Sequence, residues 1–221
     1  MRKSVREFVR ILSERLSFPG PVYEFGSLIV EGQEDFGDLR GFFPDKKYVG
    51  TDMRQGKGVD LVLDLHKIDL PDETAGSALL IDTLEHVEFC RIAMAEVHRI
   101  LRPGGLIVIT SHMRFPVHAY PNDYWRFTQE GFRSLLHQFS YSSVGFLGDQ
   151  NFPHTVAGVG IKDTDISGDM IKDINDAISL WQSLSKSYVD HYYLKLILKN
   201  IVPPFILNLI TGRGPVLPGD Y

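Results

Sequence analysis

Polar side chains of the kinds that carry acid–base chemistry directly follow the apolar run at residues 78–81. They are Asp82, Thr83, Glu85 and His86. In an open parallel sheet, ligands bind outside the carboxyl ends of the strands, so residues just after a strand lie where chemistry would be done. An imidazole titrates near neutral pH, and His86 is therefore a candidate general base. Asp82 and Thr83 would border the reacting group.

A second concentration of polar and aromatic side chains follows the apolar run at residues 106–110. His112 and His118 are further candidate bases there. The candidates for substrate binding in the same loop are Tyr120, Asp123, Tyr124, Trp125 and Arg126. Aromatic faces mixed with hydrogen-bonding groups suit a polar ring-shaped substrate such as a sugar. A second interpretation stays open, in which Trp125 and Phe127 anchor the loop on the core and Asp123 pairs with Arg126.

Acidic residues also stand at the ends of the first two predicted strands. Glu24 is followed by Gly26, and Asp52 is followed by Met53. A glycine lets the backbone approach a ligand closely. A carboxylate in the position of Asp52 can accept two hydrogen bonds from ribose hydroxyls. Asp52 is therefore the strongest single candidate for contact with a nucleoside-containing cofactor.

The spacing of the apolar residues predicts the elements that position these side chains. Residues 78–111 follow the order strand, polar turn, helix, Pro-Gly-Gly turn and strand. The other predicted strands are 22–25, 48–51, 59–63 and a closing antiparallel pair, 141–147 and 155–161. Amphipathic helices are predicted at the N-terminus, at 129–139 with Thr128 as N-cap, and at 171–184. We expect an α/β fold, a Rossmann-like, mostly parallel seven-stranded sheet with helices on both faces and an antiparallel last strand.

Composition excludes several classes of function. The 221 residues are 43% hydrophobic and 23% charged, as in an ordinary globular domain. The net charge of −5 offers no basic surface for nucleic acid, so small molecules or proteins are the expected partners. The single cysteine, Cys90, excludes an intramolecular disulfide and is expected to be buried. The first twenty residues do not resemble a signal peptide, and a cytoplasmic protein is expected.

The composition changes after residue 165. We therefore predict a main domain at residues 1–165 and an accessory segment, helical and apolar, at 166–221. The tail is strongly apolar, but Lys195 and Lys199 interrupt it too often for a membrane-spanning helix. Three roles stay open for it: covering the core, forming a homodimer contact, or lying on a membrane surface.

Several of these segments together resemble the class I S-adenosylmethionine-dependent methyltransferases, most nearly the type 11-like members that act on small molecules or glycans. The segments are VYEFGS, YVGTDM, VDLVLDL, and IDTLEHV followed by EVHRILRPGGLIVIT. PNDYWRFT is similar to a segment of methyltransferases encoded with glycan-building enzymes. The resemblance covers residues 18 to 160.

The resemblance implies S-adenosyl-L-methionine as the cofactor and methyl transfer to an oxygen or nitrogen of a small molecule or glycan intermediate. It implies cofactor contacts from Glu24, Gly26, Asp52, Met53, Asp64, Leu65, Asp82 and Thr83. Asp64 is alternatively a solvated carboxylate in a turn.

Other classes of function stay open beside this one. Leu28 and Val30 stand where the family usually has glycines, which keeps open a non-catalytic binding or scaffold protein of the same fold. A nicotinamide cofactor would need G-x-G-x-x-G after the first strand, and that motif is missing. No metal is expected, because no second cluster accompanies Glu85 at ligand spacing.

Overall fold

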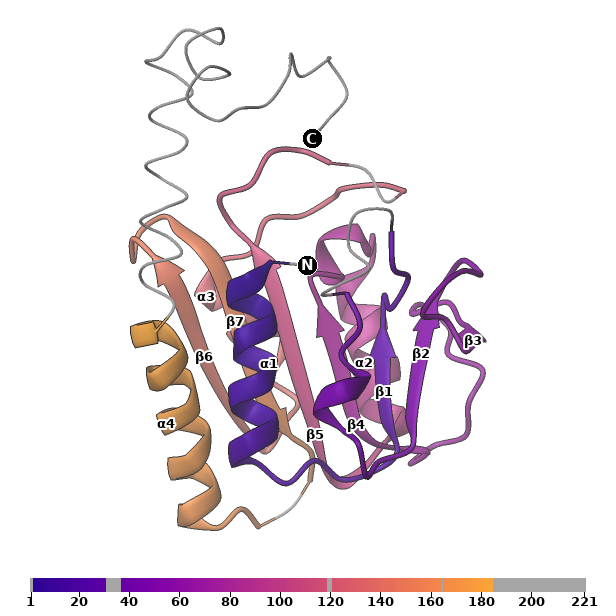
Figure 1. Ribbon diagram of the computed structural model, residues 1–221, viewed down its shortest axis with the longest axis horizontal. Helices are drawn as coiled ribbons and strands as arrows, with labels where there is room; N and C mark the ends of the chain where they lie inside the picture. The colour runs from indigo at the N-terminus through magenta and orange to yellow at the C-terminus, as the bar shows by residue number, and fades with distance from the viewer. Residues whose placement is uncertain (1, 31–36, 119–120, 164, 185–221) are drawn as a thin grey trace, which may run out of the picture.

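A seven-stranded sheet with the order β3-β2-β1-β4-β5-β7-β6 forms the centre of the molecule (Figure 1). The computed structural model describes residues 2–30, 37–118, 121–163 and 165–184. The strands are β1 (Val22–Phe25), β2 (Tyr48–Asp52), β3 (Leu61–Val62), β4 (Ala75–Ile81), β5 (Leu101–His112), β6 (Tyr141–Gly148) and β7 (Pro153–Ile161). Strands β1 to β5 pair in parallel, and β7 is antiparallel to both β5 and β6. The predicted sheet is confirmed.

Helices cover both faces of this sheet, as expected. They are α1 (Lys3–Arg15), α2 (Cys90–Ile100), α3 (Gln129–Leu135) and α4 (Gly168–Leu184). Leu79 and Ile81 of β4 pack into one core with α1 and α4, while Ala78 and Leu80 pack into a second core with α2 and α3. Side chains alternate across a strand, so a strand covered on both faces is apolar throughout. In Figure 1, α1 and α4 lie in front of the sheet and α2 behind it.

The helix α4 belongs to the same core as α1. The indole ring of Trp181 is fully buried, with its centroid 4.6 Å from that of Phe8. Its Nε1 donates a hydrogen bond to the carbonyl oxygen of Ser4 at 2.7 Å. The first part of the segment predicted as accessory is thus packed on the N-terminal helix. The rest of that segment, residues 185–221, lies outside the described residues.

Several predicted boundaries are wrong, and strand pairing explains the differences. β4 begins at Ala75, and β5 begins at Leu101, because these two residues pair across the sheet before a register shift. The predicted Pro-Gly-Gly turn therefore lies within the bounds of β5, with Gly104 at a φ of 75°. β3 has only two residues, and α3 ends at Leu135, although Thr128 caps it as expected.

The first crossover is irregular, as its glycines predict. Its described residues contain only the short 3-10 helix η1 (Arg40–Phe42). Across the described part of the chain, no helix has the length and apolar character needed to cross a bilayer.

The register of the parallel strands brings the candidate residues together. Phe25 of β1 pairs with Thr51 on one side and with Leu80 on the other. The residues that follow these positions, Gly26 and Asp52 among them, therefore meet at the carboxyl edge of the sheet. A ligand site at that edge is the general expectation for an open parallel sheet.

Candidate functional site

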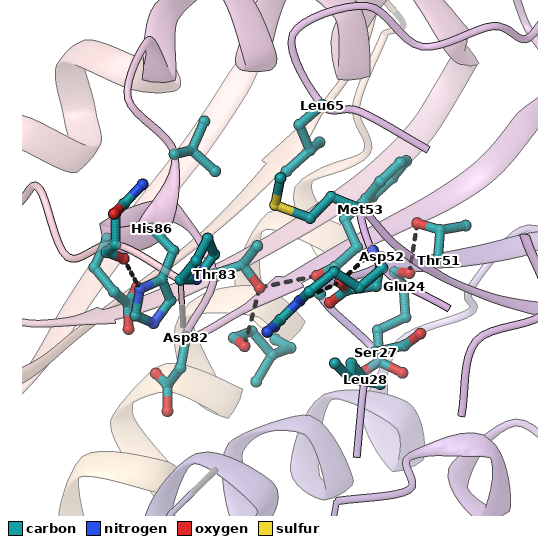
Figure 2. Close-up of a pocket in the computed structure, with 18 of the residues that line it drawn as sticks. Glu24, Ser27, Leu28, Thr51, Asp52, Met53, Leu65, Asp82, Thr83 and His86 are labelled. Carbon is teal, nitrogen blue, oxygen red and sulfur yellow. Dashed lines mark hydrogen bonds and ion pairs between the residues drawn. The ribbon is translucent and has the colours of Figure 1, made fainter. Parts of the chain in front are cut away.

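A cavity of about 510 Å³ opens at the carboxyl ends of β1, β2 and β4 and is bordered by the loop after β5. Figure 2 shows Glu24, Asp52 and Met53 toward one end of it and His86 toward the other. All eight predicted cofactor contacts line the cavity: Glu24, Gly26, Asp52, Met53, Asp64, Leu65, Asp82 and Thr83. All three candidate bases line it as well, namely His86, His112 and His118. The fold thus gathers both predicted groups in one place.

Gly26 makes the turn after β1 possible. Its φ is +84°, a backbone conformation that side-chain-bearing residues rarely adopt. A Cβ at this position would lie 2.5 Å from Oγ1 of Thr83, which itself donates a hydrogen bond to the carbonyl oxygen of Phe25. The turn therefore requires glycine for two reasons, its backbone conformation and the close approach of Thr83.

Glu24 is buried directly beneath this turn. Its Oε2 accepts a hydrogen bond of 2.7 Å from the hydroxyl of Tyr48. Burial raises the pKa of the Glu24 carboxyl to about 7, and the hydrogen bond from Tyr48 lowers it only in part. Glu24 thus changes its charge near neutral pH at the edge of the cavity.

The end of β2 places the carboxylate of Asp52 next to the apolar side chain of Met53. Oδ1 of Asp52 accepts a hydrogen bond from the backbone nitrogen of Arg54 at 2.9 Å, which orients the carboxylate. Met53 follows with 59% of its surface exposed. A polar edge beside a polarizable thioether fits a ribose next to a base.

Asp64 has a local role that the sequence had left open. Its Oδ1 accepts from the backbone nitrogen of His66 at 2.8 Å and lies 2.8 Å from Nδ1 of the same residue. The backbone hydrogen bond from His66 lowers the pKa of Asp64. Asp64 therefore stabilises the turn that contains it. Leu65, the next residue, presents an apolar side chain to the cavity.

Asp82 is held by Arg2, which precedes the N-terminal helix and which sequence reasoning did not pair with Asp82. Nη2 of Arg2 lies 2.8 Å from Oδ1 of Asp82, and Thr110 donates a hydrogen bond of 2.9 Å to the same oxygen. Burial alone would raise the pKa of Asp82, but the nearby charges of Arg2 and His112 outweigh it and hold this pKa below its ordinary value. The backbone of Asp82 has a φ of 50°, in the left-handed region that Asp tolerates better than most residues.

The three histidine rings gather at the opposite end of the cavity. The ring of His118 lies 4.8 Å from that of His86 and 5.5 Å from that of His112, centroid to centroid. Nδ1 of His86 lies 2.5 Å from the carbonyl oxygen of Asn122, so this nitrogen carries the proton. Burial lowers the pKa of His118, and the neighbouring His86 lowers it further.

Glu85 lies under this cluster and is completely buried. Its Oε2 accepts a hydrogen bond of 2.8 Å from Ser111, and its Oε1 lies 2.9 Å from Nε2 of His112. The ring of His112 stacks on Phe115, with 4.4 Å between centroids. Sequence reasoning placed Glu85 after β4 but did not connect it to His112, since no motif spacing links them.

The predicted substrate residues divide into two groups. Tyr124 lines the cavity, whereas Asp123 and Arg126 bind each other through two contacts of 2.5 and 2.7 Å. Nε1 of Trp125 donates to the carbonyl oxygen of Val87 at 2.9 Å, which fastens the loop beside the cavity. Trp125 remains 45% exposed. Tyr120 lies outside the described residues.

Comparisons with known proteins agree with this geometry. Residues 39–109 match a family model described as a methyltransferase domain. The mostly parallel seven-stranded sheet with its antiparallel β7 agrees with the fold that the sequence predicts. The middle of the chain is therefore similar to a methyltransferase domain.

Solved structures share the fold of this chain at low sequence identity. A protein from Pyrococcus horikoshii superposes with a TM-score of 0.54 at 15% identity, covering 72% of this chain and 89% of that one. A SAM-dependent methyltransferase from Archaeoglobus fulgidus gives 0.51 at 16% identity, covering 71% and 94%. The 1,6-didemethyltoxoflavin-N1-methyltransferase of Burkholderia thailandensis, solved with S-adenosylhomocysteine bound, gives 0.51 at 18% identity, covering 73% and 79%. Among the curated proteins, none matches.

The residues of the cavity fit the cofactor of a methyltransferase. Gly26 lines the cavity, and the lack of a side chain lets the backbone of its turn lie close against Thr83. Asp52 offers a carboxylate at the end of β2, and Met53 and Leu65 offer apolar surface in the same cavity. Backbone, carboxylate and apolar surface are the kinds of group that contact an amino-acid group, a ribose and an adenine, respectively.

Proposed function

We propose that this protein is an S-adenosylmethionine-dependent methyltransferase that transfers a methyl group to an oxygen or nitrogen of a small molecule or glycan intermediate. The observation that supports this most directly is the single cavity that joins the strand-end residues to the three histidines. A methyl transfer needs the donor and the acceptor in one water-poor space with the reacting atoms in line. S-adenosylmethionine, when bound, supplies the electrophilic methyl group.

We assign the cofactor end of the cavity to the residues after β1 and β2. Asp52 would accept hydrogen bonds from the ribose hydroxyls, and its fixed orientation by Arg54 reduces the entropy lost on binding. Met53 and Leu65 would pack against the adenine. Gly26 would let the backbone approach the methionine portion, with Glu24 below it as the acidic group of the turn.

We assign the acceptor end to the histidines, with His86 as the proton acceptor. Because Nδ1 of His86 donates to the carbonyl oxygen of Asn122, its Nε2 carries a lone pair. A base held in this tautomer can take the proton of a hydroxyl or amine as the new bond to carbon forms. Tyr124 lines the cavity beside His86 and would contact the acceptor.

Calorimetric titration with S-adenosylmethionine and S-adenosylhomocysteine tests the cofactor end. The protein is first shown by mass spectrometry to be free of both. We expect saturable binding that Asp52→Ala weakens by at least about tenfold, the size expected for lost charge-assisted hydrogen bonds. Asp45→Ala, which removes an exposed carboxylate outside the cavity, is the matched control. Absence of binding by the folded protein would favour a scaffold over a catalyst.

A panel of sugar nucleotides, simple glycosides and small amines tests the acceptor end, with S-adenosylhomocysteine release as the readout. For an acceptor that reacts, His86→Gln should lower kcat by about a hundredfold, the usual contribution of a general base. Cofactor affinity should not change. An unaltered kcat in this variant would reject His86 as the base and leave the cofactor assignment intact.

A further inference from the structure

We propose that Glu85, His112 and His118 bind a divalent transition-metal ion at the acceptor end of the cavity. Each of these side chains offers one ligand atom, and the three atoms lie within 4.8 Å of one another. Glu85 belongs to the 3-10 helix η2 (Leu84–His86) after β4, His112 ends β5, and His118 lies in the loop that follows. The parallel pairing of β4 with β5 ends at Ile81 and Thr110, and Glu85 and His112 both follow shortly after these positions.

The geometry of Glu85 indicates a missing third partner. Its Oε1 lies 2.9 Å from Nε2 of His112, yet among the described residues this buried oxygen has no hydrogen bond. The N–H direction of the imidazole is therefore not aimed at the oxygen, and the two atoms lie beside each other. Two atoms that each lie about 2.0–2.2 Å from one tetrahedral ion are separated by about 3.4 Å. Oε1 of Glu85 and Nε2 of His112 are therefore close enough to share an ion after a small shift of the side chains.

Surrounding hydrogen bonds hold two of the ligands in the orientation that coordination needs. Ser111 donates to Oε2 of Glu85 at 2.8 Å and leaves Oε1 available. Nδ1 of His118 lies 3.1 Å from Oδ2 of Asp123 and 3.3 Å from the carbonyl oxygen of Pro116. Both neighbours accept hydrogen bonds, so Nδ1 carries the proton and Nε2 has the lone pair. A carboxylate behind a histidine in this way is typical of metal sites.

In this arrangement the ion pair between Asp123 and Arg126 helps to position a metal ligand. Arg126 binds both oxygens of Asp123 and so fixes the carboxylate that orients His118. The two residues were candidates for substrate contact from the sequence. We instead assign them to positioning the metal ligand.

The donor set identifies the class of ion. Two imidazoles with one carboxylate suit Zn²⁺ and other first-row divalent ions, whereas Mg²⁺ and Ca²⁺ prefer oxygen ligands alone. All three ligands line the cavity, so coordination positions remain for a molecule bound there. An ion at this place would lower the pKa of an acceptor hydroxyl and make it a better nucleophile. That consequence rests on the proposed function, whereas metal binding itself does not.

Titration of untagged, chelator-treated full-length protein tests the site. Calorimetry with Zn²⁺ should give one ion per chain, and Co²⁺ should give visible absorption bands of nitrogen-ligated cobalt. His118→Ala should weaken Zn²⁺ binding by about a hundredfold, since it removes one ligand from a site where even supporting groups matter by ten- to a hundredfold. Glu85→Gln should do the same. His137→Ala, which removes an exposed histidine outside the cavity, should have no effect.

His118 lies in a loop, so its variant keeps the test valid if the substitution of buried Glu85 prevents folding. Titration of His118→Ala with S-adenosylhomocysteine checks that the cavity is intact. Equal Zn²⁺ affinity in His118→Ala and wild type would overturn the proposal, as would the lack of a stoichiometric ion in wild type. Because these titrations use no acceptor, their failure is distinguishable from failure of the proposed methyl transfer.

Discussion

Arg2 and Asp82 are 80 positions apart in the chain and form an ion pair of 2.8 Å at the edge of the cavity. Nη1 of the same guanidinium donates to Oγ1 of Thr155 at 2.6 Å. The residue preceding α1 is thereby tied to the ends of β4 and β7. Both partners of the pair line the cavity.

Arg2→Ala should lower the free energy of unfolding by about 3 kcal/mol, because it leaves a buried carboxylate without its charge partner. Urea denaturation measures this change. Glu14→Ala is the matched control, since it breaks an ion pair with Arg10 that is exposed on the same helix, and such pairs contribute less than about 1 kcal/mol. Equal losses in the two variants would show that the Arg2–Asp82 pair does not stabilise the fold.

Gly26→Ala should destabilise the protein and weaken cofactor binding. We expect a loss of roughly 2–4 kcal/mol, the sum of a left-handed backbone and a clash with Thr83. Gly104→Ala has the same kind of backbone at φ +75° but open space around the Cβ, so it isolates the backbone cost. Gly41→Ala has neither constraint and serves as the baseline. A Gly26 variant no less stable than the Gly104 variant would exclude a contribution from Thr83.

Glu24 should make the stability of the protein depend on pH. Its pKa is raised from 4.5 to about 7, so the folded state holds the proton over a range where the unfolded state has released it. The stabilisation relative to Glu24→Gln is complete below pH 4.5 and is lost as the pH rises through about 7. The full change is about 3 kcal/mol, at 1.4 kcal/mol per pKa unit.

Chemical denaturation at a series of pH values, with wild type and Glu24→Gln side by side, measures this effect. Glu130→Gln removes an exposed carboxylate and should parallel wild type throughout. Parallel curves for wild type and Glu24→Gln would show that the buried carboxyl does not change its protonation on folding.

Trp181→Ala should destabilise the protein by about 3–5 kcal/mol, the usual cost of truncating a buried aromatic side chain. The variant also leaves the carbonyl oxygen of Ser4 without its donor. Leu184→Ala, at an exposed position on the same helix, should change the free energy of unfolding little. Thermal or urea denaturation compares them. A small effect at Trp181 would mean that α4 is dispensable to the core, as a separate accessory segment would be.

The order of the elements was predictable because it depends on local periodicity. An apolar run that ends in an acidic residue, such as the one before Asp82, predicts a buried strand without knowledge of which strands lie beside it in the sheet. The helical spacing of Val5, Phe8 and Leu12 likewise reports a buried face, and all three are buried in α1. Strand limits depend on pairing as well, which is why β5 begins at Leu101 and not after the glycines.

The sequence by itself determined the succession of helices and seven strands along the chain and the edge of the sheet at which polar residues collect. It also determined the candidate residues that line the cavity. Only the tertiary structure decided which of them touch. It joined Asp82 to Arg2 and Glu85 to His112, and it selected the pairing of Asp123 with Arg126 that the sequence had left open. Periodicity tells which face of an element a side chain occupies, but the partner of a polar group is set by strand register, loop path and rotamer. Those are properties of the packed chain, and no spacing along the sequence encodes them.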